Sequence, residues 1–241
     1  MRKSNGFTLL EILIAIVIFA VLATIVYSTF NAVISKTNAI KGQTSIDDMA
    51  AACLTRISRD LRAVYVEQYP LYKPPDSGDS PDPYRFAADM DYIGTERFSR
   101  LRFASTEHLP VSTGDPENGS ASAELAQIRY HVDKSDGSET GYVLKRGDTP
   151  FPYDISENPA SDTDPEKDPV LCKGVEAFKL TCIDAEGNES ESWDSDSEAR
   201  EYATPRAVRV ELKIKAPDGT HSFSTRISLP TYREPLEDVK Q

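Results

Sequence analysis

The pattern of hydrophobic and polar positions changes once along the amino-terminal quarter of the chain. Residues 12–35 carry no charged side chain and are mostly Ile, Leu, Val, Ala and Phe, enough for a helix to cross a bilayer, which takes about 20 apolar residues. From Ile46 onwards, apolar residues recur at steps of three and four, as on one face of a helix. The pattern predicts one helix over residues 7–65, with a transmembrane segment at residues 7–35 and an amphipathic stem at residues 36–65.

The apolar face of the stem is expected to pack on the rest of the protein. The stem-packing residues on this face are Ile46, Met49, Cys53, Ile57 and Leu61. We place Asp47, Asp48, Arg56, Arg59, Asp60 and Arg62 largely on the opposite face, which is solvated or, for the arginines, meets an acidic neighbour. The prolines at positions 70, 74, 75, 81 and 83 end the helix and predict an irregular connection over residues 66–90.

Beyond this connection, alternation with a period of two predicts strands. We expect strands at Leu101–Ala104, Gln127–Val132, Tyr142–Lys145, Val175–Ile183, Ala207–Lys215 and His221–Leu229. Asp136-Gly137 and Asp218-Gly219 predict hairpins, and residues 148–168 and 184–203 are polar enough to be loops. A long amino-terminal helix packed on an antiparallel β-sheet with long loops is an α+β fold, with residues 66–241 as its main domain.

A short basic leader precedes the apolar block, and one acid lies near the start of that block. A secretory signal has an apolar core of about 7–15 residues closed by a small-residue cleavage site. This block is longer, and its small-residue junction lies ahead of it, at Gly6-Phe7. Residues 6–11, Gly-Phe-Thr-Leu-Leu-Glu, resemble the signature of the type IV prepilin family. The resemblance implies cleavage after Gly6, which removes residues 1–6 and leaves the helix on the mature protein; a plain signal anchor is the alternative.

We assign an assembly role to Glu11. A carboxylate in an apolar span costs about 2–3 kcal/mol or more, so it needs a partner. In the family that the signature resembles, the matching Glu of one subunit pairs with the terminal amine of a neighbour. Here that amine belongs to Phe7, and the prepilin peptidase also methylates it. The alternative is a Glu11 side chain that reaches lipid headgroups or bonds its own terminus.

Three further segments resemble the J-type minor pseudopilins of type II secretion systems. They are Arg59-Asp60-Leu61-Arg62, the stretch from Gly174-Val175-Glu176 to Trp193, and the stretch from Pro205-Arg206 to Leu229-Pro230. The resemblance implies a pilin-like fold and a tip complex, formed with I- and K-type minor pseudopilins, that initiates or caps the pseudopilus used to export folded proteins. The alternatives are a minor pilin that primes a type IV pilus and, from another class, a membrane-anchored adhesin or ligand-binding module.

Charge restricts the partners and the location. The chain of 241 residues has a net charge of −12, which repels nucleic acid, so we expect no nucleic-acid partner. The basic leader places the amino terminus in the cytoplasm. We therefore expect a single-pass protein in the lipid of the bacterial inner membrane, with its carboxy-terminal domain in the periplasm.

No residue pattern indicates catalysis. His108, His131 and His221 lie far apart without metal-ligand spacing, and the sequence has no Gly-rich phosphate loop or G-x-S-x-G motif. We expect no enzyme, no catalytic residue, no metal centre and no cofactor. The acidic stretches 184–189 and 194–198 lack the spacing of a calcium loop. We expect them to be solvated loops, with calcium as the alternative because some pilin-like proteins order their loops with it.

The three cysteines leave one pairing open. Cys53 falls on the apolar face of the stem and is expected in the core. On one extended strand Cys172 and Cys182 would stand about 33 Å apart, which excludes a disulfide between them. A turn at Gly174 would permit one.

Overall fold

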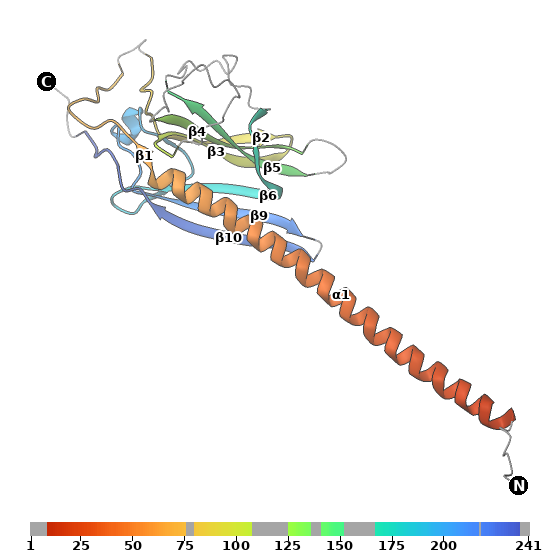
Figure 1. Cartoon of the computed structure of the whole chain (residues 1–241). Helices are drawn as coiled ribbons and strands as arrows, with labels where there is room; N and C mark the ends of the chain where they lie inside the picture. Colours follow the sequence, from red (N-terminus) through yellow and green to blue (C-terminus); the bar gives the residue numbers. More distant parts are fainter. Residues whose placement is uncertain are drawn as a thin grey trace, which may run out of the picture. The chain divides into compact units, whose positions relative to one another are not determined.

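Most of the amino-terminal quarter of the chain forms one helix, α1, from Leu9 to Arg62 (Figure 1). The structure is a computed structural model that describes residues 9–75, 80–107, 125–135, 141–151, 167–216 and 218–236, with the backbone alone described for residues 32–45. The chain divides into two units, Met1–Ser45 and Ile46–Gln241, and each is described by itself.

Helix α1 ends three residues earlier than the apolar period predicts. Val64–Tyr65 form a short strand, β1, which pairs with β3 (Glu96–Ser105). The hydroxyl of Ser105 donates to the carbonyl oxygens of Asp60 (3.1 Å) and Ala63 (3.2 Å), so a strand distant in the sequence caps the helix end. The predicted stem at residues 36–65 is therefore wrong at its end, because a tertiary contact that local periodicity does not encode terminates the helix.

An antiparallel sheet forms the body of the second unit. Its other strands are β2 (Ala87–Ile93), β4 (Ala126–Lys134), β5 (Tyr142–Pro150), β6 (Val170–Ile183), β7 (Glu189–Ser190), β8 (Trp193–Asp194), β9 (Ala207–Ala216) and β10 (Gly219–Ser228), with a 3₁₀ turn η2 (Glu198–Arg200) after β8. The strand order is β10-β9-β6-β5-β4-β3-β2-β8, with β1 beside β3 and β7 beside β6. The α+β prediction of a long helix on an antiparallel sheet is confirmed.

Both predicted hairpins form. Lys134 pairs with Tyr142 across the β4–β5 hairpin, whose Asp136-Gly137 turn lies outside the described residues, and Ala216 pairs with Gly219 across β9–β10. Strand β9 has the predicted alternation between its ends, where Val208, Val210, Leu212 and Ile214 are buried and the residues between them are not. These elements were predictable because their signals are local.

Strand β2 is absent from the predicted elements, and strands β3 and β5 extend well beyond their predicted bounds. Strand β2 begins inside the predicted connection of residues 66–90, although its Ala- and Asp-rich sequence has little β-propensity, because it pairs with β3 along all seven residues. Strand β3 begins five residues before Leu101. Residues 148–150, predicted as loop, continue β5 and pair with β4. Cross-strand partners decide these ends, and a single strand's composition does not reveal its partner.

Strand β6 carries a register shift near Gly174. The strand starts at Val170, five residues before the predicted start, and Gly174 has a φ of +69°, which favours glycine. The register against β9 shifts between Val175 and Ala177. Strict alternation along the predicted strand is broken here, since Val175 is buried together with Phe178, three residues on, while Lys179 is exposed.

Both Cys172 and Cys182 lie on β6, and all three cysteines are free thiols. Ten residues of extended strand separate the two, so the disulfide between them that the sequence left open does not form.

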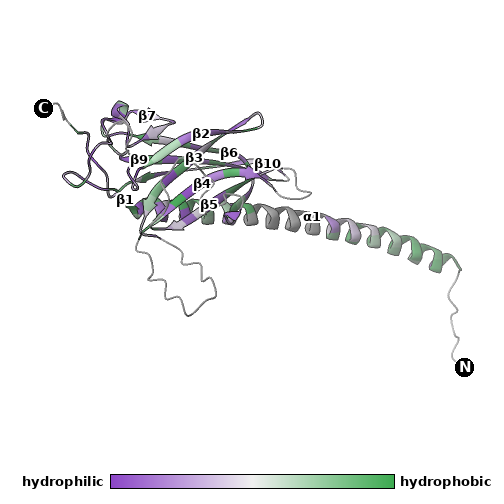
Figure 2. Cartoon of the chain, turned by 90° about the horizontal axis from the view of Figure 1, so that it is seen from above, coloured by the Kyte–Doolittle hydropathy of each residue, from purple (hydrophilic) through white to green (hydrophobic). Residues whose placement is uncertain are grey.

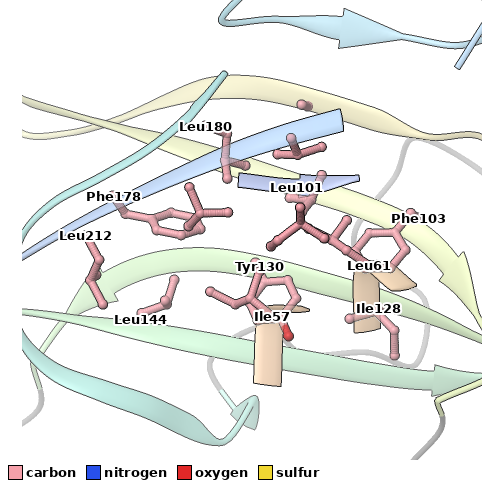
Figure 3. Packing of buried hydrophobic residues seen from close by; sticks show 14 of the residues in the cluster. Ile57, Leu61, Leu101, Phe103, Ile128, Tyr130, Leu144, Phe178, Leu180 and Leu212 are labelled. Carbon is pink, nitrogen blue, oxygen red and sulfur yellow. The ribbon is translucent and has the colours of Figure 1, made fainter. Parts of the chain in front are cut away.

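The core lies between the last four turns of α1 and the sheet (Figure 3). Ile57 and Leu61 of the helix pack into one cluster with Leu101, Ile128 and Leu144 of the sheet, each fully buried. At about 1.5–3 kcal/mol per buried large aliphatic side chain, this cluster holds the helix to the sheet.

Candidate functional site

The apolar half of α1 is exposed along its whole length. Residues Leu9–Asn31 have a mean hydropathy of 3.0 and none of them is buried, so the helix is long and apolar enough to cross a membrane. The hydrophobic colouring along α1 near its amino terminus shows the same stretch (Figure 2). Glu11 lies in the first turn and is exposed. Gly6 and Phe7, the predicted processing site, lie outside the described residues.

Two polar side chains in this segment bond to the helix itself. The hydroxyl of Thr24 donates to the carbonyl of Ala20 at 2.8 Å, and that of Thr29 to the carbonyl of Ile25 at 2.9 Å. Such bonds satisfy hydroxyls where no water is present, which suits a helix in hydrocarbon.

The predicted stem-packing residues lie on one face of α1. Cys53, Ile57 and Leu61 are fully buried, and Ile46 and Met49 are half-buried against the same cluster. On the opposite face Arg59 and Arg62 are exposed. The stem thus presents one face to its own sheet and another to its surroundings.

A buried cluster of charged side chains connects the last turns of the stem to the sheet. The carboxylate of Asp60, which is fully buried, accepts hydrogen bonds from the guanidinium of Arg146 in β5 (Nε to Oδ2, 2.7 Å) and from the hydroxyl of Tyr130 in β4 (2.5 Å). Arg56, one turn before Asp60, adds an ion pair at 2.7 Å. Arg146 also contacts Asp148 at 2.8 Å.

The pKa shifts of this cluster follow from burial and from the carboxylate. Burial raises the pKa of Tyr130 well above its usual value, and the charge of Asp60 raises it further. Burial alone would lower the pKa of the Arg146 guanidinium, but the hydrogen bonds and the attraction to Asp60 outweigh burial and raise that pKa. At neutral pH the Tyr130 hydroxyl therefore keeps its proton and the Arg146 guanidinium keeps its charge.

The sequence analysis placed Asp60 and Arg56 on the solvated face, and the structure shows the opposite for Asp60. Asp60 lies three residues after Ile57 and seven after Cys53, so helical spacing alone would have placed it on the apolar face. The acid was assigned to the solvated face because an isolated carboxylate is rarely buried. Its partner Arg146 is 86 residues away in the sequence, and no local signal connects the two.

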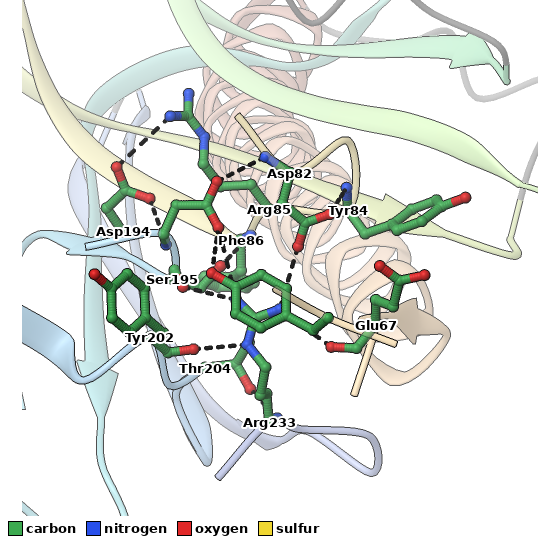
Figure 4. A network of polar contacts seen from close by, with 12 residues as sticks. Glu67, Asp82, Tyr84, Arg85, Phe86, Asp194, Ser195, Tyr202, Thr204 and Arg233 are labelled. Carbon is green, nitrogen blue, oxygen red and sulfur yellow. Dashed lines mark hydrogen bonds and ion pairs between the residues drawn. The ribbon is translucent and has the colours of Figure 1, made fainter. Parts of the chain in front are cut away.

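A second buried cluster, centred on Arg233, ties down the carboxy-terminal segment (Figure 4). The guanidinium is almost fully buried and donates to the carbonyls of Tyr202 (2.6 Å), Ser195 (2.7 Å) and Glu67 (3.1 Å). It also pairs with the carboxylate of Asp82 at 3.2 Å and stacks on the ring of Tyr72, 3.2 Å from the ring centroid.

This Arg233 cluster holds together parts of the chain that the sequence analysis treated as irregular. Burial raises the pKa of Asp82, although the backbone N–H of Tyr84 and the Arg233 guanidinium oppose the shift. Asp196 accepts from the Tyr72 hydroxyl (2.9 Å) and from the backbone N–H of Asp82 (2.7 Å). The connection after the helix, the turn after β8 and the carboxy-terminal segment are thus one cross-linked structure, which no local pattern predicted.

Carboxylates in and between the two acidic stretches are bound by basic side chains or backbone N–H groups. Asp184 accepts from the backbone N–H of Asn188 at 2.7 Å, Glu189 pairs with Arg209 at 2.6 Å, and Glu191 pairs with Lys179 at 2.6 Å. Within the described residues, no three His, Cys, Asp or Glu side chains converge as metal ligands would. That these stretches bind no calcium stays a prediction, which calorimetry tests.

The histidines do not converge either. His131 of β4 lies 3.8 Å from Asp168, and burial lowers its pKa below 6.5. His221 contacts Asp218 at 3.0 Å on the surface, and His108 lies outside the described residues. Among the hollows of the described part of the chain is an open groove of about 400 Å³ beside Leu71 and Tyr72. These features form no acid–base or nucleophile constellation.

Two protein-family models match the chain, one after the other. Residues 1–27 match the prokaryotic N-terminal methylation motif. Residues 28–222 match protein J of the type II secretion system. The first match covers the basic leader, Glu11 and much of the apolar helix, and the second covers the stem and most of the sheet.

Proposed function

The chain belongs to the type II secretion system protein J family, and from that membership we propose that it acts at the tip of the pseudopilus. The family match makes it a minor pseudopilin of type II secretion, a structural rather than an enzymatic subunit of the minor-pilin complex. Its apolar amino-terminal helix anchors it to the membrane as a single pass. The observation that carries the proposal is the match over residues 28–222, directly after a methylation motif.

At the tip, this subunit associates with the I- and K-type minor pseudopilins and starts or caps the filament that exports folded proteins. Before assembly it resides in the lipid of the inner membrane, with the sheet domain in the periplasm. The prepilin peptidase cuts after Gly6 and methylates the amine of Phe7. The basic leader supports this orientation.

Glu11 is the proposed assembly residue. It lies exposed in the first turn of an apolar helix, where a carboxylate surrounded by lipid is costly. An ammonium at the amino terminus of a neighbouring subunit would neutralise it and set the axial register of the two helices.

The two buried charge clusters support a mechanical role. Asp60 and Arg146 link the last turn of the stem to the centre of the sheet, so a displacement of the stem is transmitted to the domain. A tip subunit has to push cargo or the outer channel without its domain separating from its helix.

Co-purification of the full-length chain in detergent with the I- and K-type pseudopilins encoded beside it tests the complex. A stable ternary complex is expected, and a chain that elutes alone in the presence of both partners would contradict the tip assignment. A strain that retains the secretion cluster but secretes normally without this chain would also contradict it.

The role of Glu11 is tested by Glu11→Ala and Glu11→Gln. Both variants should insert in the membrane but fail to support secretion, since both lack the negative charge. Asp47→Ala, an exposed acid on the same helix, is the matched control and should secrete as wild type. Wild-type secretion by Glu11→Ala would remove the proposed role.

A further inference from the structure

Two thiols from distant parts of the chain meet inside the core. Cys53 lies on the buried face of α1 and Cys172 near the start of β6, with exposed fractions of 0% and 1%. The two thiols are close enough to interact, and the interaction raises the pKa of Cys53 and lowers that of Cys172. Both belong to the same core cluster as Ile57, one turn beyond Cys53, and Leu144, the β5 partner of Cys172.

The third cysteine does not take part in this contact. Cys182 lies ten residues along β6 from Cys172, or about 33 Å at about 3.3 Å per residue. Burial raises the pKa of the Cys182 thiol to about 12, so it stays protonated and inert. The thiols that the fold brings together are therefore Cys53 and Cys172.

We propose that Cys53 and Cys172 form an intramolecular disulfide that ties the stem helix to strand β6. Both side chains lie in one buried cluster between the helix and the sheet and interact with each other, which is the proximity that a disulfide needs. This inference rests on the proposed periplasmic location of the domain, because disulfides persist in oxidising compartments.

The oxidation balances by thiol–disulfide exchange. The two thiols give up two protons and two electrons and form the S–S bond, while the disulfide of a periplasmic dithiol–disulfide oxidoreductase takes them up and becomes two thiols. The step passes through a mixed disulfide on one of the two cysteines. Since both sulfurs are buried in the folded domain, the exchange occurs before the stem docks on the sheet or during a local opening.

The bond would reinforce the connection between helix and domain. The closed loop runs from Cys53 to Cys172 and contains β1 to β5, and such a long loop loses much of its freedom in the unfolded chain. Together with the Asp60–Arg146 pair two turns further along α1, it would give the stem a covalent as well as an ionic link to the sheet.

Purified full-length chain in detergent micelles tests the pairing directly. Reduced wild-type chain is unfolded, refolded with glutathione disulfide, alkylated under denaturing conditions and digested. A cross-linked peptide pair containing Cys53 and Cys172 is expected, with Cys182 alkylated. The oxidised chain should melt about 5 °C or more above the reduced chain. A peptide pair containing Cys182, or three alkylated thiols, would overturn the proposal.

Variants and cells provide the remaining readouts. Cys182→Ala should still gain the faster mobility of a cross-linked chain on non-reducing gels, whereas Cys53→Ala and Cys172→Ala should not. In cells, thiols are trapped by alkylation before lysis, and protease accessibility of the domain is measured in the same sample. A disulfide in a protease-accessible domain supports the proposal, and free thiols in such a domain overturn it. If the domain is protected from protease in cells while the purified chain still forms the bond, the periplasmic location and the bond in cells are overturned. The pairing of Cys53 with Cys172 in the fold would then still stand.

Discussion

Replacing Asp60 with alanine tests the claim that a buried charge cluster holds the stem on the sheet. The change removes a fully buried carboxylate and leaves the guanidinium of Arg146, itself only 5% exposed, without its main partner. Breaking one side of a buried ion pair costs about 3–5 kcal/mol. Because Arg146 retains Asp148 at 2.8 Å, we expect the lower end, about 3 kcal/mol.

The magnitude can be read from urea unfolding of the full-length chain in detergent. Trp193 is the only tryptophan and is 5% exposed, so its fluorescence reports the opening of the sheet domain. With a slope of about 2 kcal/mol per M, a loss of about 3 kcal/mol lowers the midpoint by about 1.5 M. Asp48→Ala, an exposed acid on the same helix, should shift it by no more than about 0.25 M.

A double variant separates charge from packing. In Asp60→Leu with Arg146→Met no unpaired buried guanidinium remains, but Asp148 and the Tyr130 hydroxyl each lose one contact, so part of the loss should be recovered. Additive losses in the double variant, or a midpoint shift below about 0.3 M for Asp60→Ala, would refute the reasoning.

Four further outcomes are expected. Arg233→Met should lower the free energy of unfolding by about 3–5 kcal/mol and expose the carboxy-terminal segment to limited proteolysis, because it leaves the buried carboxylate of Asp82 unpaired; the exposed Arg226→Met is the control. Ser105→Ala should cost about 1 kcal/mol in urea unfolding, since it removes the cap on the end of α1. Because burial lowers the pKa of His131, the folded state prefers the neutral ring. The free energy of unfolding should therefore fall as pH drops below 6.5, by at most about 1.4 kcal/mol per pH unit. His131→Gln should show a shallower fall between pH 7.5 and about 5.5. Millimolar calcium should give no saturable heat in calorimetry, because the carboxylates of Asp184, Glu189 and Glu191 are already bound by basic side chains or backbone N–H groups.

Local signals explain the parts of the fold that the sequence predicted. The apolar run, the three-and-four spacing from Ile46 and the alternation in β9 each reflect the direction of side chains along one element. For this reason the helix, both hairpins and the buried stem residues could be assigned without a structure. The candidate site at residues 6–11 was equally local, because the leader, the junction and Glu11 are adjacent in the chain.

Contacts between distant segments explain the parts that were missed. Strand β2 forms because β3 and β8 pair with it, and α1 ends at Arg62 because Ser105 caps it. Asp60 was placed on the wrong face because its burial depends on Arg146, which belongs to another element. The sequence of one element does not reveal which residue of another element will pair with a polar side chain and make the burial of that side chain favourable.

The sequence by itself determined that this chain has an amino-terminal helix apolar enough to cross a membrane, followed by an antiparallel sheet, and that its amino terminus carries the methylation motif with its acid. Only the tertiary structure decided how the stem is held, through Asp60 with Arg146 and through the core cluster that brings Cys53 and Cys172 together. The physical reason is that periodicity reports which way a side chain points, whereas a buried charge or thiol depends on a partner that only the folded chain brings near.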